Sequence, residues 1–237
     1  MGSYRIDVLG VPLDIATDYL QLAQSLGSGH IVTLNAEMVM AARRHPRLRT
    51  VIQGAELVVP DGAGVVLYGR WRGHKIDRCP GIDLAARLLE SAREKGQKVF
   101  FLGAKPDVIP RTVAHWQQQL PSLQIVGWHH GYFDAPAEGE ILQTLHQTQP
   151  HLILVALGVP KQEIWIAEHR SLCPHALWMG VGGSFDIWAG VKKRAPQWLG
   201  RMHLEWLYRL LQEPSRWRRM AVLPQFLWLA LWDRKIG

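Results

Sequence analysis

Short β-branched and apolar runs alternate with segments of helical periodicity along most of this chain. Strands are predicted at 30–34, 57–59, 99–102, 124–127, 152–157 and 176–181. Helices are predicted between them at 35–44, 62–69, 84–95 and 107–119, with a further helix that Pro160 starts. Asn35 and Asp83 are the expected caps of two of these helices. This alternation predicts an α/β fold with a mostly parallel sheet and helices on both of its faces.

The end of the chain differs from the rest in charge and composition. Residues 192–237 hold ten Lys/Arg and three Asp/Glu, a balance of +7, whereas residues 1–191 hold 17 of each sign. The same segment holds five of the eleven tryptophans. Three short helices are predicted there, at 204–212, 215–223 and 226–232, with breaks at Pro214 and Pro224. We therefore expect a catalytic body at 1–196 and a basic, Trp-rich helical appendage at 197–237.

A neutral body with a basic, apolar end is typical of a protein that works against an anionic membrane surface. The longest apolar run, 221–232, is about a dozen residues, and a spanning helix needs roughly 20. Cys79 and Cys173 lack the spacing of a metal or redox pair and are expected to be free thiols of a reducing compartment. The expected location is cytoplasmic, peripheral on the inner face of the plasma membrane.

Polar residues and glycines gather where the predicted strands end. In open α/β sheets, ligands bind outside the carboxyl ends of the strands. Each position alone is typical of a helix cap or a turn, but their clustering on one edge indicates a binding site. The positions are Thr33, Asn35, Asp61, Gly103, Gly131, Tyr132, Gln162, Glu163, Gly182 and Gly183.

Two further features favour an anionic ligand. The segment 158–163 joins a buried strand to a helix start, where free backbone N–H groups and the helix dipole attract phosphate, and Lys161 and Gln162 would add donors. Arg209, Arg216 and Arg219 are spaced to share a helix face, and arginine binds diphosphate bidentately. The alternatives are an ordinary strand–helix turn and a solvated basic face.

Several motifs of other enzyme classes are absent. The chain has no Asp-x-Asp metal clamp, no Walker A loop and no Gly-x-Ser-x-Gly elbow. The segment 180–185 lacks the third glycine of a dinucleotide fingerprint, which argues against a nicotinamide-dependent oxidoreductase.

The ordered motifs resemble those of the bacterial WecG/TagA/CpsF glycosyltransferases from about residue 6 to 220. They are 33–37 (Thr-Leu-Asn-Ala-Glu), 60–62 (Pro-Asp-Gly), Arg78 with 81–83, 127–133, 158–163, 180–183, 193–196, 204–210 and 213–216. Val159 and His203 depart from the family's usual Ala and Gly, which bears on the choice of donor more than on activity.

The resemblance implies a Rossmann-like inverting transferase that moves a sugar from a UDP-sugar to an undecaprenyl-diphosphate-linked sugar. The expected transferred sugar is N-acetylmannosamine and the expected acceptor is lipid-linked N-acetylglucosamine. No cofactor and no metal are expected. The resemblance makes Asp61 the general base and aligns Thr33, Asn35, Arg78 and Gln162 with the family's polar site residues. It aligns Arg209, Arg216 and Arg219 with the family's tail arginines, and the uridine is expected near Gly103, Gly131 and Tyr132.

Other functions stay open from the sequence. A relative of the same chemistry would use UDP-glucose or a uronic acid donor. A non-enzymatic protein would use the basic tail on nucleic acid, although the Trp and Leu content of the tail argues against that partner. A homo-oligomer is possible, because an apolar tail packs on a sister subunit as readily as on lipid.

Overall fold

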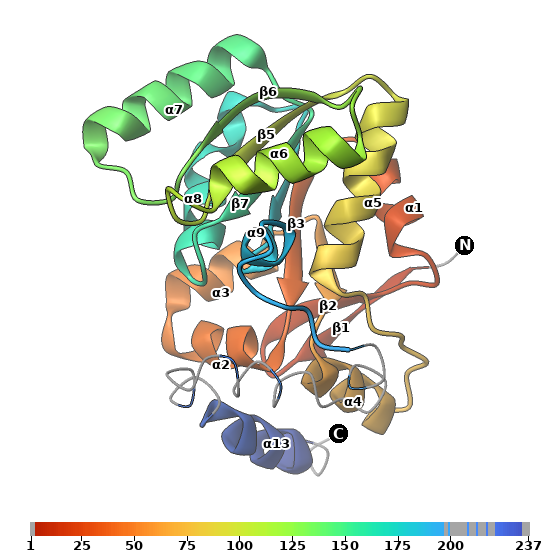
Figure 1. Cartoon of the computed structure of the whole chain (residues 1–237). Helices are drawn as coiled ribbons and strands as arrows, with labels where there is room; N and C mark the ends of the chain where they lie inside the picture. The colour runs from red at the N-terminus through yellow and green to blue at the C-terminus, as the bar shows by residue number, and fades with distance from the viewer. Residues whose placement is uncertain are drawn as a thin grey trace.

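The computed structural model describes residues 3–196, 199, 208, 212, 217 and 221–233. Its centre is a six-stranded sheet in the order β4-β3-β8-β7-β5-β6, in which every neighbouring pair is parallel (Figure 1). The strands are β3 (Gly29–Leu34), β4 (Leu57–Pro60), β5 (Lys98–Gly103), β6 (Gln124–His129), β7 (Leu152–Ala156) and β8 (Leu177–Gly180). The predicted α/β class with a parallel sheet is confirmed.

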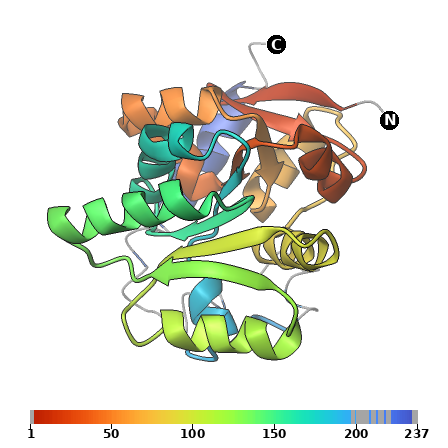
Figure 2. The ribbon, with the colours of Figure 1, turned by 90° about the horizontal axis from the view of Figure 1, so that it is seen from above.

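Helices cover both faces of this sheet, as Figure 2 shows for α6 and α7. Alternate side chains of each strand enter different cores: Phe101 packs with α5 and α6, whereas Phe100 packs with α7 and α8. This period of two is what a strand buried on both faces requires. The body helices are α1 (Tyr19–Leu26), α2 (Ala36–Arg44), α3 (Pro46–Gln53), α4 (Ala63–Trp71), α5 (Gly81–Glu94), α6 (Ile109–Gln119), α7 (Ala135–Thr148), α8 (Lys161–His169) and α9 (Ser184–Trp188), with a 3₁₀ turn at Arg170–Leu172.

An antiparallel hairpin that the sequence analysis missed, β1 (Tyr4–Val8) with β2 (Val11–Ile15), lies beside β4. Its two-residue turn, Leu9–Gly10, has φ of 55° and 92°, the positive values that tight hairpin turns need. Asp14 ties the hairpin to the sheet, because its Oδ2 accepts the Val58 backbone N–H at 2.7 Å.

Two predicted helix starts are wrong. Helix α5 begins at Gly81 rather than after Asp83, since the Asp61 side chain accepts the Gly81 N–H and satisfies this end of the helix. Helix α13 (Val222–Asp233) runs through Pro224, where a break was expected. A proline in the first turn costs no hydrogen bond, because the N–H groups there have no partner within the helix.

The C-terminal helix α13 packs on the body between α2 and α4. Phe226 and Ala230 are buried in the core around these two helices. At its end, Asp233 accepts hydrogen bonds from Tyr68 and from Arg72, the latter at 2.7 Å. The other predicted tail helices, 204–212 and 215–223, lie outside the described residues except for Tyr208, Gln212, Trp217 and the start of α13.

The opposite face of α13 is apolar and exposed. It carries Leu227, Trp228, Leu231 and Trp232, each between 40% and 59% exposed. Among the residues that the structure describes, no helix is long and apolar enough to cross a bilayer.

Candidate active site

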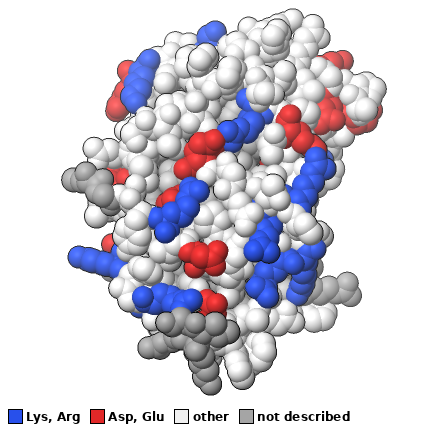
Figure 3. All heavy atoms as spheres, turned by 180° about the vertical axis from the view of Figure 1, so that it is seen from behind, with Lys and Arg blue, Asp and Glu red and all other residues white. Residues whose placement is uncertain are grey.

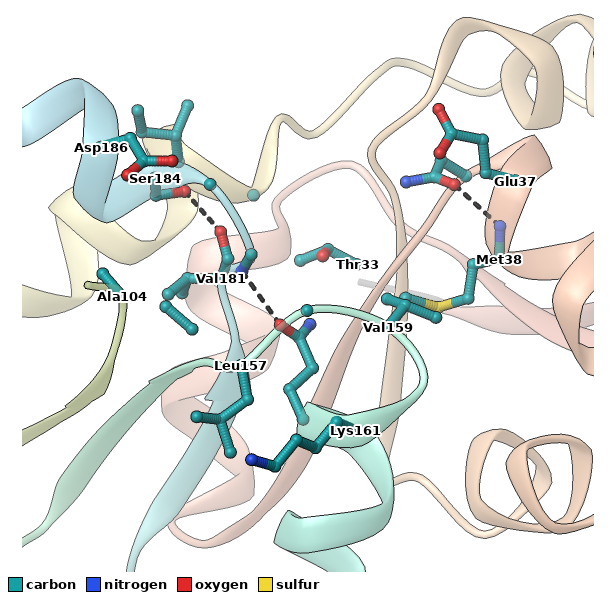
Figure 4. A pocket seen from close by; sticks show the side chains of 18 of the residues that line it. Thr33, Glu37, Met38, Ala104, Leu157, Val159, Lys161, Val181, Ser184 and Asp186 are labelled. Atoms are coloured by element: carbon teal, nitrogen blue, oxygen red, sulfur yellow. Dashed lines mark hydrogen bonds between the residues drawn. The ribbon is translucent and has the colours of Figure 1, made fainter. Parts of the chain in front are cut away.

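A cleft of about 1190 Å³ opens at the carboxyl ends of the parallel strands. Its floor is formed by residues at or just after five strand ends: Thr33, Asp61, Ala104, Leu157 and Val181. Several of them are seen from close by in Figure 4. This is the position at which open α/β sheets bind ligands. The volume exceeds that of sites for drug-sized ligands, roughly 300–1,000 Å³, and so leaves room for more than one sugar unit.

Most of the sequence-predicted site residues of the body line this cleft together: Thr33, Asn35, Asp61, Gly131, Tyr132 and Gln162. Arg78 and Gly103 are not among the residues that line it. Gly103 ends β5 with φ of 126°, and a Cβ there would lie 2.4 Å from the Ala156 carbonyl oxygen, so only glycine fits. Arg209, Arg216 and Arg219 lie outside the described residues.

Asp61 is fixed in position at the end of β4. Its backbone N–H donates to the Leu34 carbonyl at 2.9 Å, and its Oδ1 accepts the Gly81 N–H at 2.9 Å. Arg78 donates from Nε to the Asp61 carbonyl and places Nη2 3.9 Å from Oδ1. The Asp61 side chain is 19% exposed and lines the cleft. Its contacts with Gly81 and Arg78 set the orientation of the carboxylate. An oriented carboxylate at the floor of a cleft is suited to take a proton from a bound hydroxyl group.

Thr33 lies in the neighbouring strand β3, and Asn35 follows the end of that strand. Asn35 Oδ1 accepts the Met38 N–H at 2.9 Å, which confirms the predicted cap of α2. Thr33 is buried, and its hydroxyl donates to the Gly180 carbonyl at 3.3 Å. Both side chains thus support the cleft wall as well as line it.

Gln162 was expected to offer donors to a phosphate, and its hydrogen bonds are instead made within the protein. It is 2% exposed; Nε2 donates to Glu163 Oε1 at 2.8 Å, and Oε1 accepts the Gly182 N–H at 3.2 Å. Glu163 Oε2 in turn lies 2.7 Å from His30 Nε2. The Gln162 amide therefore holds the loop after β8 in place, and its direction is set by Glu163.

The sequence analysis missed His30 as a site-supporting residue and gave Glu163 no role of its own. Both are fully buried, at 1% and 0% exposure, and Glu163 holds Gln162 of the cleft lining. A polar residue in the apolar strand 30–34 was the available signal, because a buried imidazole needs a partner. The partner is 133 residues away in the chain, so the sequence pattern did not reveal the pair.

Cations surround the mouth of the cleft. Lys161, at the start of α8, lies with Nζ 4.7 Å from the centre of the Phe133 ring, next to the Val159–Pro160 cis peptide. Lys192 and Arg194 also line the cleft and pair with Asp186 and Asp83 at 2.7 and 2.6 Å. The remaining basic residues of the lining are Arg44, Lys105 and Lys193. This set of cations suits a phosphate-bearing ligand.

Both cysteines are free, as expected. Burial, together with the nearby carboxylates Asp61 and Asp83, raises the pKa of the Cys79 thiol to about 12. Burial raises the pKa of Cys173 to about 11. At neutral pH both groups are therefore protonated thiols and not nucleophiles. Within the described residues, no three His, Cys, Asp or Glu side chains are grouped to hold a metal ion.

Comparison with known proteins assigns the chain to a family. The model of the "Glycosyl transferase WecG/TagA/CpsF family" matches residues 4–237. The chain belongs to the WecG/TagA/CpsF family of glycosyltransferases. The resemblance carried by the sequence motifs is confirmed.

Two curated relatives of this family are N-acetylglucosaminyldiphosphoundecaprenol N-acetyl-beta-D-mannosaminyltransferases. The chain is 39% identical over 214 residues to that of Bacillus spizizenii, covering 90% of this chain and 81% of the relative. It is 36% identical over 222 residues to that of Bacillus subtilis (strain 168), covering 92% and 86%. The family match at residues 4–237 includes every element that builds the cleft.

Proposed function

We propose that the protein transfers N-acetylmannosamine from a UDP-sugar to N-acetylglucosamine linked through diphosphate to undecaprenol. The observation that carries this proposal is a cation-rimmed cleft at the sheet edge with the oriented carboxylate of Asp61 at its floor. The names of the two relatives supply the sugar and the acceptor.

In the proposed reaction, Asp61 takes the proton of the acceptor hydroxyl as its oxygen attacks the anomeric carbon of the donor. The carbon–oxygen bond to UDP breaks at the same time, and UDP leaves with the electron pair. One displacement inverts the anomeric centre, so an α-linked donor gives a β-linked product. General base catalysis of this kind contributes about 10²–10⁴-fold.

Side-chain cations are proposed to stabilise the departing diphosphate without a metal ion. Fixed positive charge aimed at a developing negative charge is an effective way to lower a barrier. Lys105 and Lys161 line the described cleft, and Arg209, Arg216 and Arg219 of the tail are proposed to add to them. The uridine is proposed near Gly131 and Tyr132, where the exposed Tyr132 ring offers a stacking surface.

The protein is proposed to act at the inner face of the plasma membrane as a peripheral protein. The outer face of α13 supports this, because Trp228 and Trp232 lie exposed beside Leu227 and Leu231. Tryptophan is favoured at the membrane–water interface, and each nearby basic residue adds roughly 1 kcal/mol of attraction to an anionic leaflet.

The stereochemistry of the product tests this proposal. Nuclear magnetic resonance of the disaccharide formed from an α-linked UDP-sugar, in the presence of EDTA, should show a β linkage. An α-linked product would contradict the single displacement at Asp61, and a requirement for added metal would contradict stabilisation by side chains alone.

A donor panel separates the alternatives. Preferential turnover of UDP-glucose or of a uronic acid donor would keep the mechanism and change the substrate. Binding to nucleic acid without binding to anionic vesicles would favour the non-enzymatic alternative instead.

A further inference from the structure

We propose that one face of α2 is the binding track of the acceptor, and that Arg44 binds the acceptor diphosphate. This inference rests on the proposed function, because it assigns a place to the diphosphate-linked substrate. It concerns a part of the cleft that the reaction at Asp61 does not use.

The cleft extends from the strand ends along α2 toward α13. The lining residues of α2 are Glu37, Met38, Ala41 and Arg44, followed by His45 at its end. Their spacing places them within about one third of the helix circumference, since each residue turns the helix by about 100°. Val39 and Ala42 of α2 enter the core and do not line the cleft, whereas Met38 lies in the same core and also lines the cleft. The cleft thus follows a single face of this helix.

The chemistry of this face changes along its length. Glu37, in the first turn, follows the Asn35 cap, and Gly62, next to Asp61, would place a Cβ only 2.6 Å from that of Asn35. Carboxylates accept hydrogen bonds from hydroxyl groups, so this end suits a sugar. Met38 and Ala41 follow, and Arg44 stands about 10 Å from Glu37 along the axis.

An acceptor whose sugar lies at Asp61 would place its diphosphate toward the Arg44 end. The distance from Glu37 to Arg44 along the helix axis is of the order of one sugar ring and its linkage. A guanidinium group binds phosphate in bidentate geometry. Arg44 Nη2 donates to Gln225 Oε1 of α13 at 2.9 Å, which holds the side chain between the two helices. On the face seen in Figure 3, blue side chains gather at the lower right and red side chains at the upper right.

The track then continues to a surface that suits the lipid. Val222 of α13 lines the same cleft, and the outer face of α13 carries Trp228 and Trp232. The order along the molecule is therefore carboxylates, then Arg44, then apolar surface. A sugar, a diphosphate and an isoprenoid chain follow one another in the same order.

A kinetic comparison of two adjacent arginines tests the inference. Arg44→Ala should raise KM for a short-chain lipid-diphosphate N-acetylglucosamine roughly 10-fold, the lower end for a hydrogen bond to a charged group. KM for the UDP-sugar should not change. Arg43→Ala is the matched control, because Arg43 points to the Leu9 carbonyl on another face of α2 and does not line the cleft.

A neutral acceptor gives a second comparison. An alkyl glycoside of N-acetylglucosamine lacks the diphosphate, so Arg44→Ala should leave its turnover unchanged while lowering that of the diphosphate acceptor. Equal losses with both acceptors would mean that the substitution disturbs the site generally, and would overturn the assignment. A raised KM for the UDP-sugar would place Arg44 at the donor diphosphate and also overturn it.

Direct binding distinguishes failure of this inference from failure of the proposed function. Calorimetric titration with the same short-chain lipid-diphosphate sugar should show weaker binding to Arg44→Ala and unchanged binding to Arg43→Ala. If the wild-type protein binds it in this Arg44-dependent way but forms no product, the proposed reaction is wrong and the track stands. If product forms and both arginine variants behave as wild type, the reaction stands and the track is wrong.

Discussion

Replacement of Phe226 by alanine tests whether the C-terminal helix is part of the folded body. Phe226 is 1% exposed and lies in one core with residues of α2 and α4. Its ring stands 6.4 Å from that of Tyr68, which is itself anchored to Asp233 at the end of the same helix. Phe226 is therefore the larger of the two buried side chains of α13.

The expected cost follows from burial. Removing a buried phenylalanine side chain destabilises a protein by about 3–5 kcal/mol. For a chain of this size, each kcal/mol lowers Tm by roughly 2–4 °C, so Tm should fall by about 6–20 °C. Leu227→Ala is the control: that side chain is 40% exposed, and its loss should change stability by no more than about 0.5 kcal/mol.

Thermal unfolding followed by circular dichroism tests the buried face of the helix, and vesicle sedimentation tests its exposed face. Phe226→Ala should lower Tm, whereas the double substitution of Trp228 and Trp232 by alanine should keep Tm and reduce sedimentation with anionic vesicles. An unchanged Tm for Phe226→Ala would refute the packing argument. Point variants are preferable to deleting the tail, because deletion from residue 197 also removes the buried Phe226 and Ala230.

Three further results are expected. Asp61→Asn should lower turnover by about 10²–10⁴-fold with little change in Tm, because its amide oxygen can still accept the N–H at the start of α5; turnover like that of the wild type would remove Asp61 as the base. Glu163→Ala should cost roughly 1–3 kcal/mol of unfolding free energy for each buried polar group that it leaves without a partner, His30 and Gln162. Glu168→Gln, on the exposed side of the same helix, should cost under about 1 kcal/mol. Burial raises the pKa of Tyr19 and Tyr68 to about 12, so their contribution to stability is complete below the unfolded pKa of about 10 and is lost as pH rises toward 12. Absorbance at alkaline pH should show that two of the five tyrosines ionise at higher pH than a free tyrosine. Titration of all five near pH 10 would contradict the burial of Tyr19 and Tyr68.

The strand ends were predictable from sequence because parallel strands place their carboxyl ends at one edge. Thr33, Asp61 and Gly131 lie far apart in the chain, yet all line the cleft. Asn35 was recognisable as a cap from its place between a strand and a helix, and its bond to Met38 bears that out. Each of these positions is marked by its immediate sequence neighbours, and the folded structure keeps it at the end of a strand or the start of a helix.

Long-range contacts account for what the sequence did not predict. The bond between His30 and Glu163 depends on the order of strands in the sheet. Gln162, which was predicted to bind a phosphate, instead supports the Gly182 loop. Helix α5 starts earlier than predicted because Asp61, twenty residues earlier in the chain, accepts its first N–H group. In both cases tertiary partners override local propensity.

The central claim is tested most directly by one turnover assay. The protein is mixed with UDP-N-acetylmannosamine and a short-chain lipid-diphosphate N-acetylglucosamine in EDTA, and the lipid products are resolved by mass. The account predicts a lipid-linked disaccharide and release of UDP in equal amounts. Release of UDP without the disaccharide, or no reaction with any UDP-sugar and this acceptor, would contradict it.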